Sequence, residues 1–319
     1  MKMKIAESVT KYHPDKICDS ISDAVVDACL ARDKYSRVAI ETVGGHGKIM
    51  LMGEVTSLVK VDFAQLALDK YNQLTGLEIK VLTNIVAQSP EIQQKVDNGG
   101  AGDQGLMIGY ACNENESYLP QEMYLARKLL EGFKVDGKSQ VVMEGEKILN
   151  VVLSVQGKTQ QELEKHVIKT LPSATQSMYC NNIGKFEIGG FESDSGCTGR
   201  KIVVDAYGGR VPVGGGAFSG KDPTKVDRSA AYMARWIALQ LLKKYGAKEV
   251  MVKLGYVIGK AEPLLQVALI DDKEEKLTDF DCRPQAIIEK FDLLRPIYND
   301  LAENGHFGRS ELPWEKIEQ

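Results

Sequence analysis

The sequence predicts an α+β fold of two or three domains. Segments typical of helices and strands follow one another without strict β-α-β alternation, which favours α+β over a doubly wound parallel sheet. A length of 319 residues corresponds to two or three domains at about 100–200 residues each. A faint repeat is a third indication, because PDKI at residues 14–17 resembles PTKV at residues 223–226. Matches this short also arise by chance, so the residues alone leave a threefold repeat open.

The first half of the chain is expected to alternate helices with pairs of strands. Apolar residues at helical spacing follow Pro14, a residue favoured just inside a helix start, and they predict a helix at the N-terminus. A polar, glycine-rich stretch over residues 88–105 indicates a loop. The expected elements are helices over residues 14–30, 63–74 and 122–131, strands over residues 37–43, 49–59 and 106–111, and a hairpin over residues 140–155.

The second half is expected to contain the longest helix of the chain, over residues 225–245. Ala231, Ala234, Ile237 and Leu241 fall on one side of this segment, which is typical of a helix packed on a core. Six glycines in residues 208–222 predict an irregular loop just before it. The remaining expectations are helices over residues 162–170 and 284–291 and strands over residues 201–205, 251–258 and 264–270.

Charge and composition argue against several classes of protein. The chain has 40 basic and 44 acidic residues, a net charge of −4, whereas a general nucleic-acid binder needs a basic excess. No run approaches 18 apolar residues and the N-terminus lacks the apolar core of a secretory signal, so no membrane span or export is expected. Six cysteines are scattered singly, which is typical of reduced thiols in a cytoplasmic protein.

The first glycine motif, GAGDQG at residues 100–105, matches the G-x-G-x-x-G pattern of dinucleotide-binding sites. That interpretation requires a strand before the motif and a helix after it. Here a polar segment precedes it and an apolar, strand-like run follows, so the order is reversed. The residues leave open a flexible loop and a loop whose Asp103 contacts a ligand.

The second glycine motif, GGAFSGKD at residues 215–222, departs from a P-loop at its last position. Asp222 stands where a P-loop has a serine or threonine that binds Mg²⁺. Glycines still let backbone N–H groups approach an anion, Lys221 adds positive charge, and a helix N-terminus follows. A purely structural glycine turn is the alternative.

Charged residues gather at three places that together suit a polyphosphate. HPDK at residues 13–16 and KDPTKVD at residues 221–227 precede or begin helices, and Arg200 and Lys201 follow a glycine-containing turn. Each cluster alone is also typical of a solvated surface, and a histidine before proline can simply cap a helix. Taken together they offer cations, helix dipoles and two carboxylates able to share Mg²⁺ with phosphate oxygens. This combination predicts a nucleoside triphosphate as ligand.

At these residues the sequence resembles the S-adenosylmethionine synthetase (methionine adenosyltransferase) family. The resemblance lies in long stretches that occur in the family's order, at residues 7–28, 100–114, 196–209, 214–235, 305–309 and 313–316. It implies three similar α/β units related by pseudo-threefold symmetry, with mixed sheets and helices on one face. The units are expected over residues 1–95, 96–187 and 188–319, with the chain able to interleave between them.

The resemblance also implies a reaction and its partners. ATP and L-methionine are expected to give S-adenosylmethionine by attack of sulfur on C5′, and the tripolyphosphate that leaves is hydrolysed to phosphate and pyrophosphate. Two Mg²⁺ ions per site and K⁺ are the expected cofactors. A homodimer with active sites between the subunits is expected, with pairing into a tetramer as a further option.

Individual site residues follow from the same motifs. The resemblance implies catalytic roles for His13, Lys138, Arg200, Lys201 and Lys221. It implies contacts with ATP or methionine for Glu54, Gln88, Asp103, Asp136, Lys185, Phe186, Asp194, Ala217 and Lys225. It assigns Mg²⁺ to Asp15 and Asp227, K⁺ to Glu41, and a gating loop to residues 88–98.

The chain departs from the family pattern near its loops. Tyr12 stands where the family usually has glycine, and Lys185 stands where arginine is common. Segments near residues 75–85 and 130–140 look trimmed, as does the link to GAGDQG, which bears on the length of the gating loop and on tetramer contacts. The alternative functions are a P-loop-like ATP hydrolase and a non-catalytic nucleotide-binding relative.

Overall fold

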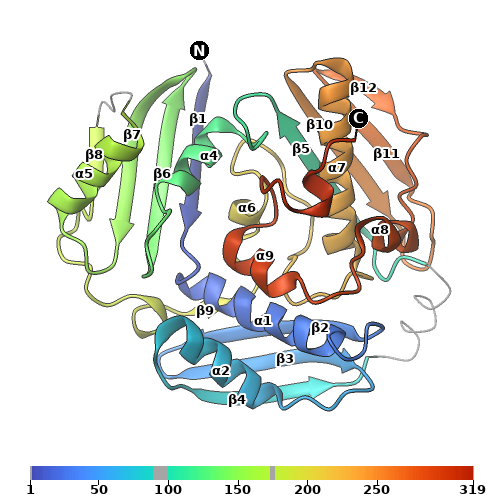
Figure 1. Cartoon of the computed structure of the whole chain (residues 1–319), viewed down its shortest axis with the longest axis horizontal. Helices are drawn as coiled ribbons and strands as arrows, with labels where there is room; N and C mark the ends of the chain where they lie inside the picture. Colours follow the sequence, from blue (N-terminus) through green and yellow to red (C-terminus); the bar gives the residue numbers. More distant parts are fainter. Residues whose placement is uncertain (1, 89–99, 173–176, 319) are drawn as a thin grey trace.

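Three sheets of four strands each, two of them mixed and the third antiparallel, organise the part of the chain that the structure describes, residues 2–88, 100–172 and 177–318 (Figure 1). In this computed structural model the sheets run in the orders β4-β3-β2-β9, β1-β6-β7-β8 and β12-β11-β10-β5. Within them β3 pairs with β4 and β7 with β8 in parallel, and the other pairs are antiparallel. The expected α+β class is confirmed.

The strands have the following bounds. The first sheet contains β2 (Arg37–Gly45), β3 (Lys48–Thr56), β4 (Lys80–Val86) and β9 (Gly196–Cys197). The second contains β1 (Met3–Val9), β6 (Gly137–Glu144), β7 (Lys147–Val155) and β8 (Ser177–Cys180). The third contains β5 (Gly105–Cys112), β10 (Glu249–Tyr256), β11 (Leu265–Ile270) and β12 (Lys273–Lys276).

Each sheet includes a strand from a distant part of the chain. The N-terminal strand β1 pairs with β6, and the register begins with Met3 opposite Glu144. Likewise β9 joins β2, and β5 joins β10. Long-range pairing of this kind ties the three sheets into one folding unit, and it brings residues near position 200 beside the N-terminal helix.

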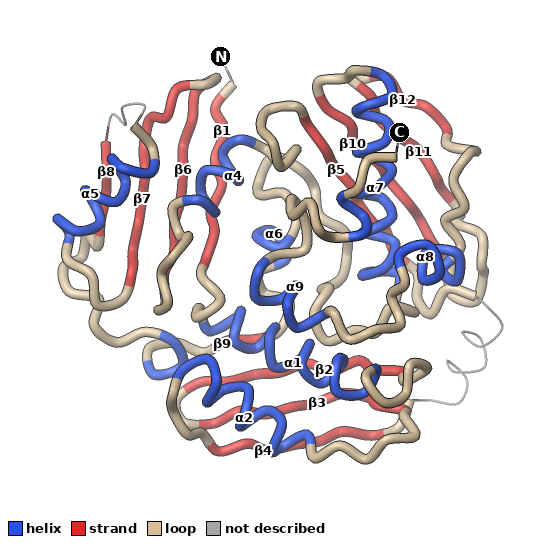
Figure 2. The backbone as a smooth tube through the Cα atoms, viewed as in Figure 1, coloured by secondary structure: helices blue, strands red, loops and turns tan. Residues whose placement is uncertain are grey.

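Helices cover the faces of the sheets that point toward the middle of the molecule (Figures 1 and 2). Helices α1 and α2 lie on the β2–β4 sheet, α4 and α5 on the β1–β8 sheet, and α7 and α8 beside the third sheet. The helices are α1 (Pro14–Leu30), α2 (Phe63–Thr75), α4 (Gln121–Lys128), α5 (Gln160–Thr170), α6 (Ile202–Asp205), α7 (Val226–Tyr245), α8 (Pro284–Phe291) and α9 (Tyr298–Asn304), with short 3₁₀ turns η1 (Gly190–Glu192) and η2 (Pro313–Glu315).

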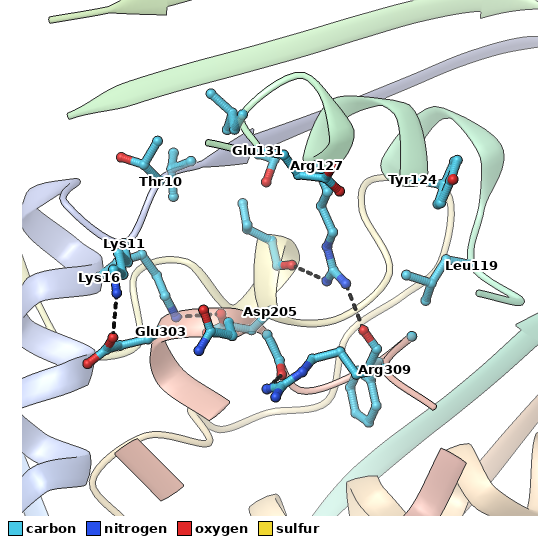
Figure 3. Close-up of a pocket in the computed structure, with 18 of the residues that line it drawn as sticks. Thr10, Lys11, Lys16, Leu119, Tyr124, Arg127, Glu131, Asp205, Glu303 and Arg309 are labelled. Atoms are coloured by element: carbon cyan, nitrogen blue, oxygen red, sulfur yellow. Dashed lines mark hydrogen bonds and ion pairs between the residues drawn. The ribbon is translucent and has the colours of Figure 1, made fainter. Parts of the chain in front are cut away.

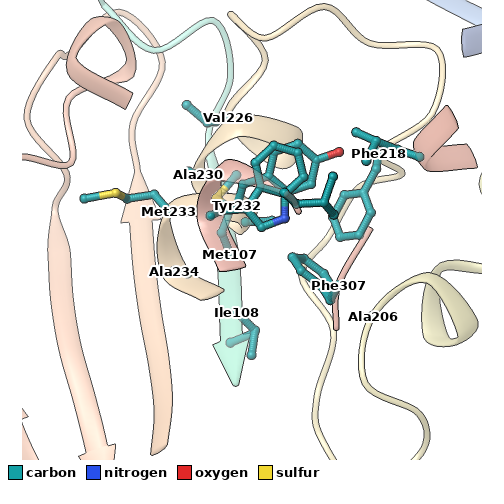
Figure 4. Close-up of a cluster of buried hydrophobic side chains, with 14 of the residues drawn as sticks. Met107, Ile108, Ala206, Phe218, Val226, Ala230, Tyr232, Met233, Ala234 and Phe307 are labelled. Atoms are coloured by element: carbon teal, nitrogen blue, oxygen red, sulfur yellow. The ribbon is translucent and has the colours of Figure 1, made fainter. Parts of the chain in front are cut away.

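Helix α7 forms the centre of the main hydrophobic core. The ring of Tyr232 stacks on Trp314 with centroids 3.9 Å apart, and Phe218 and Phe307 pack edge to face beside them (Figure 4). Strand β5 approaches the helix very closely, because a Cβ added at Gly109 would lie 2.0 Å from the backbone of Ala234. The apolar stripe predicted for this helix is confirmed by its burial.

One predicted element is wrong. The β-branched run at residues 201–205 was expected to form a strand, but it forms the helical turn α6, in which the amide of Asp205 donates to the carbonyl of Lys201 at 2.8 Å. The turn places Lys201 and Asp205 on one face, four residues apart, and both side chains bind residues at the start of α1. Tertiary ion pairs therefore outweigh the strand propensity of this short run.

Several elements match their expected bounds, and others were not foreseen. The helices over residues 14–30 and 284–291 and the hairpin over residues 140–155 are confirmed. Strands β1, β4, β8, β9 and β12 and helix α9 were not predicted. Apart from Gln88, the expected gating loop falls on residues 89–98, outside the described residues.

All six cysteines are unpaired in the structure. In the described part of the chain, no helix is both long and apolar enough to cross a membrane.

Candidate active site

The first charged cluster surrounds Asp15 in the opening turn of α1. One carboxylate oxygen of Asp15 accepts hydrogen bonds from the amide of Cys197 at 2.9 Å and from Nε of Arg200 at 2.8 Å. The other oxygen lies 2.5 Å from Nζ of Lys201. Burial alone would raise the pKa of Asp15, but the bonds from Lys201 and Cys197 hold this pKa below its usual value. The carboxylate is therefore charged and surrounded by cations at neutral pH.

His13 caps the same helix and is held neutral. Its Nδ1 accepts a hydrogen bond from the amide of Asp15 at 3.2 Å, which is the geometry of an N-cap. Burial lowers the pKa of His13 to about 4, and the positive charge of Lys201 acts in the same direction. The charges of Lys138 and Asp194 also act on the imidazole, so both residues lie near it. Lys138 projects from β6 and pairs with Glu7 at 3.0 Å.

Lys16, although it belongs to the HPDK motif, does not join this cluster. Its ammonium lies 3.0 Å from Asp19 Oδ2 and 2.7 Å from Asp205 Oδ1, and all three side chains are buried. Asp15 and Lys16 thus bind the N-cap residue and the last residue of α6, Lys201 and Asp205. The expectation that residues 13–16 act as one polyphosphate-binding group is corrected for Lys16, because buried carboxylates hold its charge.

The second charged cluster lies on the glycine-rich loop before α7. Nζ of Lys221 is 2.6 Å from Oδ2 of Asp227, which lies in the first turn of the helix. The backbone at Gly216 approaches the same carboxylate so closely that a Cβ there would lie 2.3 Å from it. A cation, a carboxylate and glycine backbone therefore meet at one helix N-terminus, as the sequence predicts.

Asp222, which stands where a P-loop has serine or threonine, has a structural role. Its buried carboxylate accepts hydrogen bonds from the amides of Val38 at 2.7 Å and Thr224 at 2.9 Å, and it pairs with Lys225 at 2.5 Å. The ammonium of Lys225 keeps the pKa of Asp222 low even though burial opposes this shift. A residue committed in this way does not act as the metal-binding hydroxyl of a P-loop, so the P-loop hydrolase finds no support.

Strand β2 links the two clusters. Val43 lies opposite Cys197 beside the first cluster, and Ala39 forms a bridge with Lys221 of the second. Four residues of strand separate these points, which corresponds to roughly 13 Å. The glycine-rich loop also contacts the turn before Arg200, since a Cβ at Gly199 would lie 2.6 Å from the Cβ of Ala217.

The other predicted site residues are placed as follows. Asp136 is buried just before β6 and accepts a hydrogen bond from the amide of Gly190 at 2.9 Å, and burial raises its pKa. Glu41 is exposed on β2, whereas Glu54 on β3 is partly buried. Glu41 lies near the first cluster, because its charge acts on the thiol of Cys197. The described contacts do not join either cluster to Glu54, Gln88, Asp103, Lys185 or Phe186, and Lys185 pairs with Glu187 at 3.4 Å on the surface.

The carboxylates suit a metal that is shared with substrate rather than caged by protein. In residues 2–88, 100–172 and 177–318, no group of three or more histidine, cysteine, aspartate or glutamate side chains is arranged to hold a metal ion. Asp15 and Asp227 are single carboxylates, each beside a lysine. Mg²⁺ is typically bound by one or two carboxylates together with substrate phosphates, so this donor set fits it.

Sequence reasoning missed two charged residues behind the second cluster. Asp23 on α1 and Arg228 on α7 form an ion pair of 2.6 Å with both side chains fully buried. Both positions lie off the apolar stripe of their predicted helices, so the local pattern gave no signal for this buried pair.

A cavity of about 440 Å³ is lined by both polar and apolar side chains (Figure 3). Lys11, Lys16, Arg127, Asp205 and Glu303 are among its lining residues. The lining includes none of the predicted site residues. The cavity and the first cluster therefore lie on different sides of the α1–α6 contact.

Comparison with known proteins covers nearly the whole chain. Residues 2–98, 98–186 and 188–316 match the N-terminal, central and C-terminal domains of S-adenosylmethionine synthetase. The chain is 42% identical to the S-adenosylmethionine synthase of Clostridium tetani (strain Massachusetts / E88), covering 99% of this chain and 97% of the relative. It is 40% identical to the enzyme of that name from Corynebacterium glutamicum, covering 100% of this chain and 96% of the relative.

The alignments extend over 381 and 390 positions, more than the 319 residues of this chain, so these relatives contain internal segments that it lacks. The coverage nevertheless runs from end to end, and it includes the stretches that carry both charged clusters. The chain belongs to the S-adenosylmethionine synthetase family.

Proposed function

We propose that this protein makes S-adenosylmethionine from ATP and L-methionine and then hydrolyses the tripolyphosphate to phosphate and pyrophosphate. The methionine sulfur forms a bond to C5′ while the bond from C5′ to the triphosphate oxygen breaks. The observation that carries the proposal is the cluster at the start of α1, where a neutral His13, Arg200 and Lys201 surround Asp15. This cluster offers both donors and positive charge to a polyanion.

This reaction needs no activated nucleophile from the protein. A thioether sulfur carries no proton, so no general base is required for its attack. The difficulty lies with the leaving group, because negative charge shifts onto the bridging oxygen as the bond to C5′ breaks. Preorganised donors such as His13, Arg200, Lys201 and Lys221 stabilise that charge, and each such donor contributes about 3–4 kcal/mol by analogy with oxyanion holes.

The ion pairs of the two clusters indicate where the phosphates of the substrate bind. Lys201 and Lys221 are held beside Asp15 and Asp227, so each lysine is already fixed near a position that an anionic ligand would take. Mg²⁺ held by Asp15 and Asp227 would supply Lewis-acid stabilisation of the phosphate oxygens. We also propose K⁺ at Glu41, an exposed carboxylate on β2 that faces away from the buried Thr42.

Substrate contacts are proposed for the remaining residues that the resemblance assigns. Asp136 and Asp194 lie close enough to the first cluster to interact electrostatically, since Asp194 acts on Asp136 and on His13. Carboxylates in this position suit the ribose hydroxyls or the sulfonium that forms. Glu54, Gln88, Asp103, Lys185, Phe186, Ala217 and Lys225 complete the proposed set.

We further propose that the protein works as a homodimer with active sites between the subunits, and that it acts in the cytoplasm. Val43, Met50 and Leu82 form one row across β2, β3 and β4 on the face opposite α1 and α2, and Val43 and Leu82 are 46% and 44% exposed. An apolar row on the open face of a sheet suits a subunit interface.

The unpaired cysteines support the proposed cytoplasmic location, because thiols stay reduced in that compartment.

The deciding experiment incubates the purified protein with ATP, L-methionine, Mg²⁺ and K⁺ and follows products by mass spectrometry. We expect S-adenosylmethionine, phosphate and pyrophosphate in equal amounts. Reactions without methionine are the control. Release of ADP without any need for methionine, from folded protein, would contradict the proposal.

A further inference from the structure

A buried ion pair fixes the backbone of the glycine-rich loop from behind. Arg228 Nη2 lies 2.6 Å from Asp23 Oδ2, and Nη1 lies 2.7 Å from Oδ1, so the pair is bidentate. Both side chains are fully buried. The pair joins α1 to α7, the two helices whose first turns carry Asp15 and Asp227.

Both members of the pair also bind the loop itself. The amide of Gly220 donates to Asp23 Oδ1 at 2.8 Å, and Nη1 of Arg228 donates to the carbonyl of Lys221 at 2.8 Å. On the other side, the carbonyl of Gly220 accepts a hydrogen bond from the amide of Ile40 at 2.9 Å. The two backbone units that flank the Cα of Lys221 are therefore held, while its side chain extends toward Asp227.

The pair is itself held rigidly. Nε of Arg228 donates to the hydroxyl of Tyr232 at 3.1 Å, and the ring of Tyr298 lies 4.3 Å from the guanidinium carbon. Burying two charges costs several kcal/mol of desolvation per ion, so such a pair is weak evidence for added stability. Its contacts with the loop indicate a different benefit, which is a fixed position for a side chain that must meet an anion.

We infer that Asp23 and Arg228 are positioning residues that set the backbone of Lys221 and thereby place its ammonium for the departing polyphosphate. This inference rests on the proposed function and adds to it a specific dependence of Lys221 on a pair that touches no substrate. Preorganised charge is effective only when held close to the productive geometry, and a displacement of about 1 Å costs about 10²-fold in rate.

The test compares Arg228→Lys and Asp23→Asn with a matched control, Arg235→Lys. Arg235 lies on the same helix and forms a similarly buried pair with Glu315 at 2.8 Å, but its other bonds go to carbonyls of residues 110, 117 and 118, away from the loop. Lysine does not reproduce the bidentate fork of arginine, so Arg228→Lys and Arg235→Lys each break a buried pair. Circular dichroism first confirms that each variant is folded at the assay temperature. Asp23→Asn, which keeps the shape of the side chain, serves if Arg228→Lys does not fold.

We expect Arg228→Lys and Asp23→Asn to lower kcat roughly 10- to 100-fold, while KM for methionine changes less than about threefold. Arg235→Lys should keep kcat within about threefold of the parent, even if its unfolding midpoint falls as much as that of Arg228→Lys. An equal loss of kcat in Arg235→Lys at equal stability would mean that any buried break has this effect, and it would overturn the inference.

The sharper readout is a double-mutant cycle with Lys221→Ala. If the pair acts through Lys221, then Arg228→Lys should lower kcat less than about threefold in the Lys221→Ala background, because the side chain that the pair positions is gone. The same fold-loss in both backgrounds would overturn the inference.

Calorimetric titration with tripolyphosphate separates this inference from the proposed function. Arg228→Lys should weaken tripolyphosphate binding about three- to tenfold in the parent and not in Lys221→Ala. A parent protein that makes no S-adenosylmethionine would refute the proposed function, and the binding cycle would still decide the positioning role. Equal weakening in both backgrounds would reject it.

Discussion

Lys16 Nζ lies 2.7 Å from Asp205 Oδ1, whereas the adjacent Asp15 binds Lys201, the N-cap residue of α6. These two neighbouring residues of the HPDK motif therefore have different roles. Asp15 faces the charged cluster, and Lys16 anchors α6 to α1 from the side of the cavity. The predictions below follow from this division and from the contacts of the glycine-rich loop.

Lys16→Met should destabilise the protein without removing a donor from the cluster. The change leaves Asp19 and Asp205, which are 0% and 4% exposed, without their cation, and breaking a buried pair costs about 3–5 kcal/mol. The free energy of unfolding from urea titration measures this loss. Lys2→Met, an exposed change, is the control, and a loss below about 1 kcal/mol for Lys16→Met would be evidence against the anchoring role.

The pKa of His13 makes stability depend on pH. The histidine titrates near 6.5 in the unfolded chain but near 4 in the folded protein, so between these values the unfolded chain binds more protons. The free energy of unfolding should therefore fall as the pH drops from about 6.5 toward 4. Titration of the His13 imidazole by NMR checks this directly, and a pKa between 6 and 7 would contradict it.

His13→Asn should separate capping from catalysis. Asparagine is a good N-cap, so the stability at pH 7 should stay within about 1 kcal/mol of the parent. Loss of the imidazole donor near the triphosphate should slow formation of S-adenosylmethionine by roughly 10²-fold. The part of the pH dependence that His13 contributes should also disappear. Turnover close to that of the parent would remove His13 from the proposed mechanism.

Lys221→Ala should slow turnover by roughly 10²-fold or more, because the cation on the glycine-rich loop is lost. The side chain of Asp227 is only 10% exposed and loses its ion-pair partner, so the free energy of unfolding should fall as well. Initial rates with saturating ATP and methionine provide the measurement. Lys243→Ala, an exposed change in the last turn of the same helix, should leave the rate unchanged. Similar rates for both variants would exclude Lys221 from the chemistry.

Gly220→Ala should displace the loop that carries Lys221. Gly220 has a φ of 82°, and an added Cβ would lie 1.9 Å from the carbonyl oxygen of Ile40. Both activity and stability should fall, with about 2–4 kcal/mol lost from the free energy of unfolding. Gly76→Ala is a matched control, since φ is 73° but no atom lies within 4 Å, and it should cost only about 1–2 kcal/mol.

The proposed dimer is tested by placing charge on the apolar row of the first sheet. Met50→Glu combined with Leu82→Glu puts two carboxylates beside each other on the face away from α1, where they should shift the mass measured by light scattering from dimer to monomer. Activity should fall with dimer content if the site needs both subunits. A parent protein that is monomeric at micromolar concentration would refute this arrangement.

The sequence by itself determined the strongly periodic helices and the family. Apolar spacing after Pro14 and across residues 226–245 is a strong local signal, because a helix must bury one stripe wherever it packs. The glycine-rich loop and its cations were also readable locally, since glycine backbone, Lys221 and a helix N-terminus are adjacent in the chain. Their long motif matches led directly to the family.

The tertiary structure alone decided which charges meet. Residues 201–205 form a helical turn because Lys201 and Asp205 each bind a residue on α1 that is more than 180 positions away. The same holds for Asp23 and Arg228, which are 205 positions apart. Ion pairs over such separations depend on how the sheets exchange strands, and local propensity carries no information about them. For this reason the sequence located the cations of the two charged clusters, whereas only the folded chain showed which carboxylate holds each one.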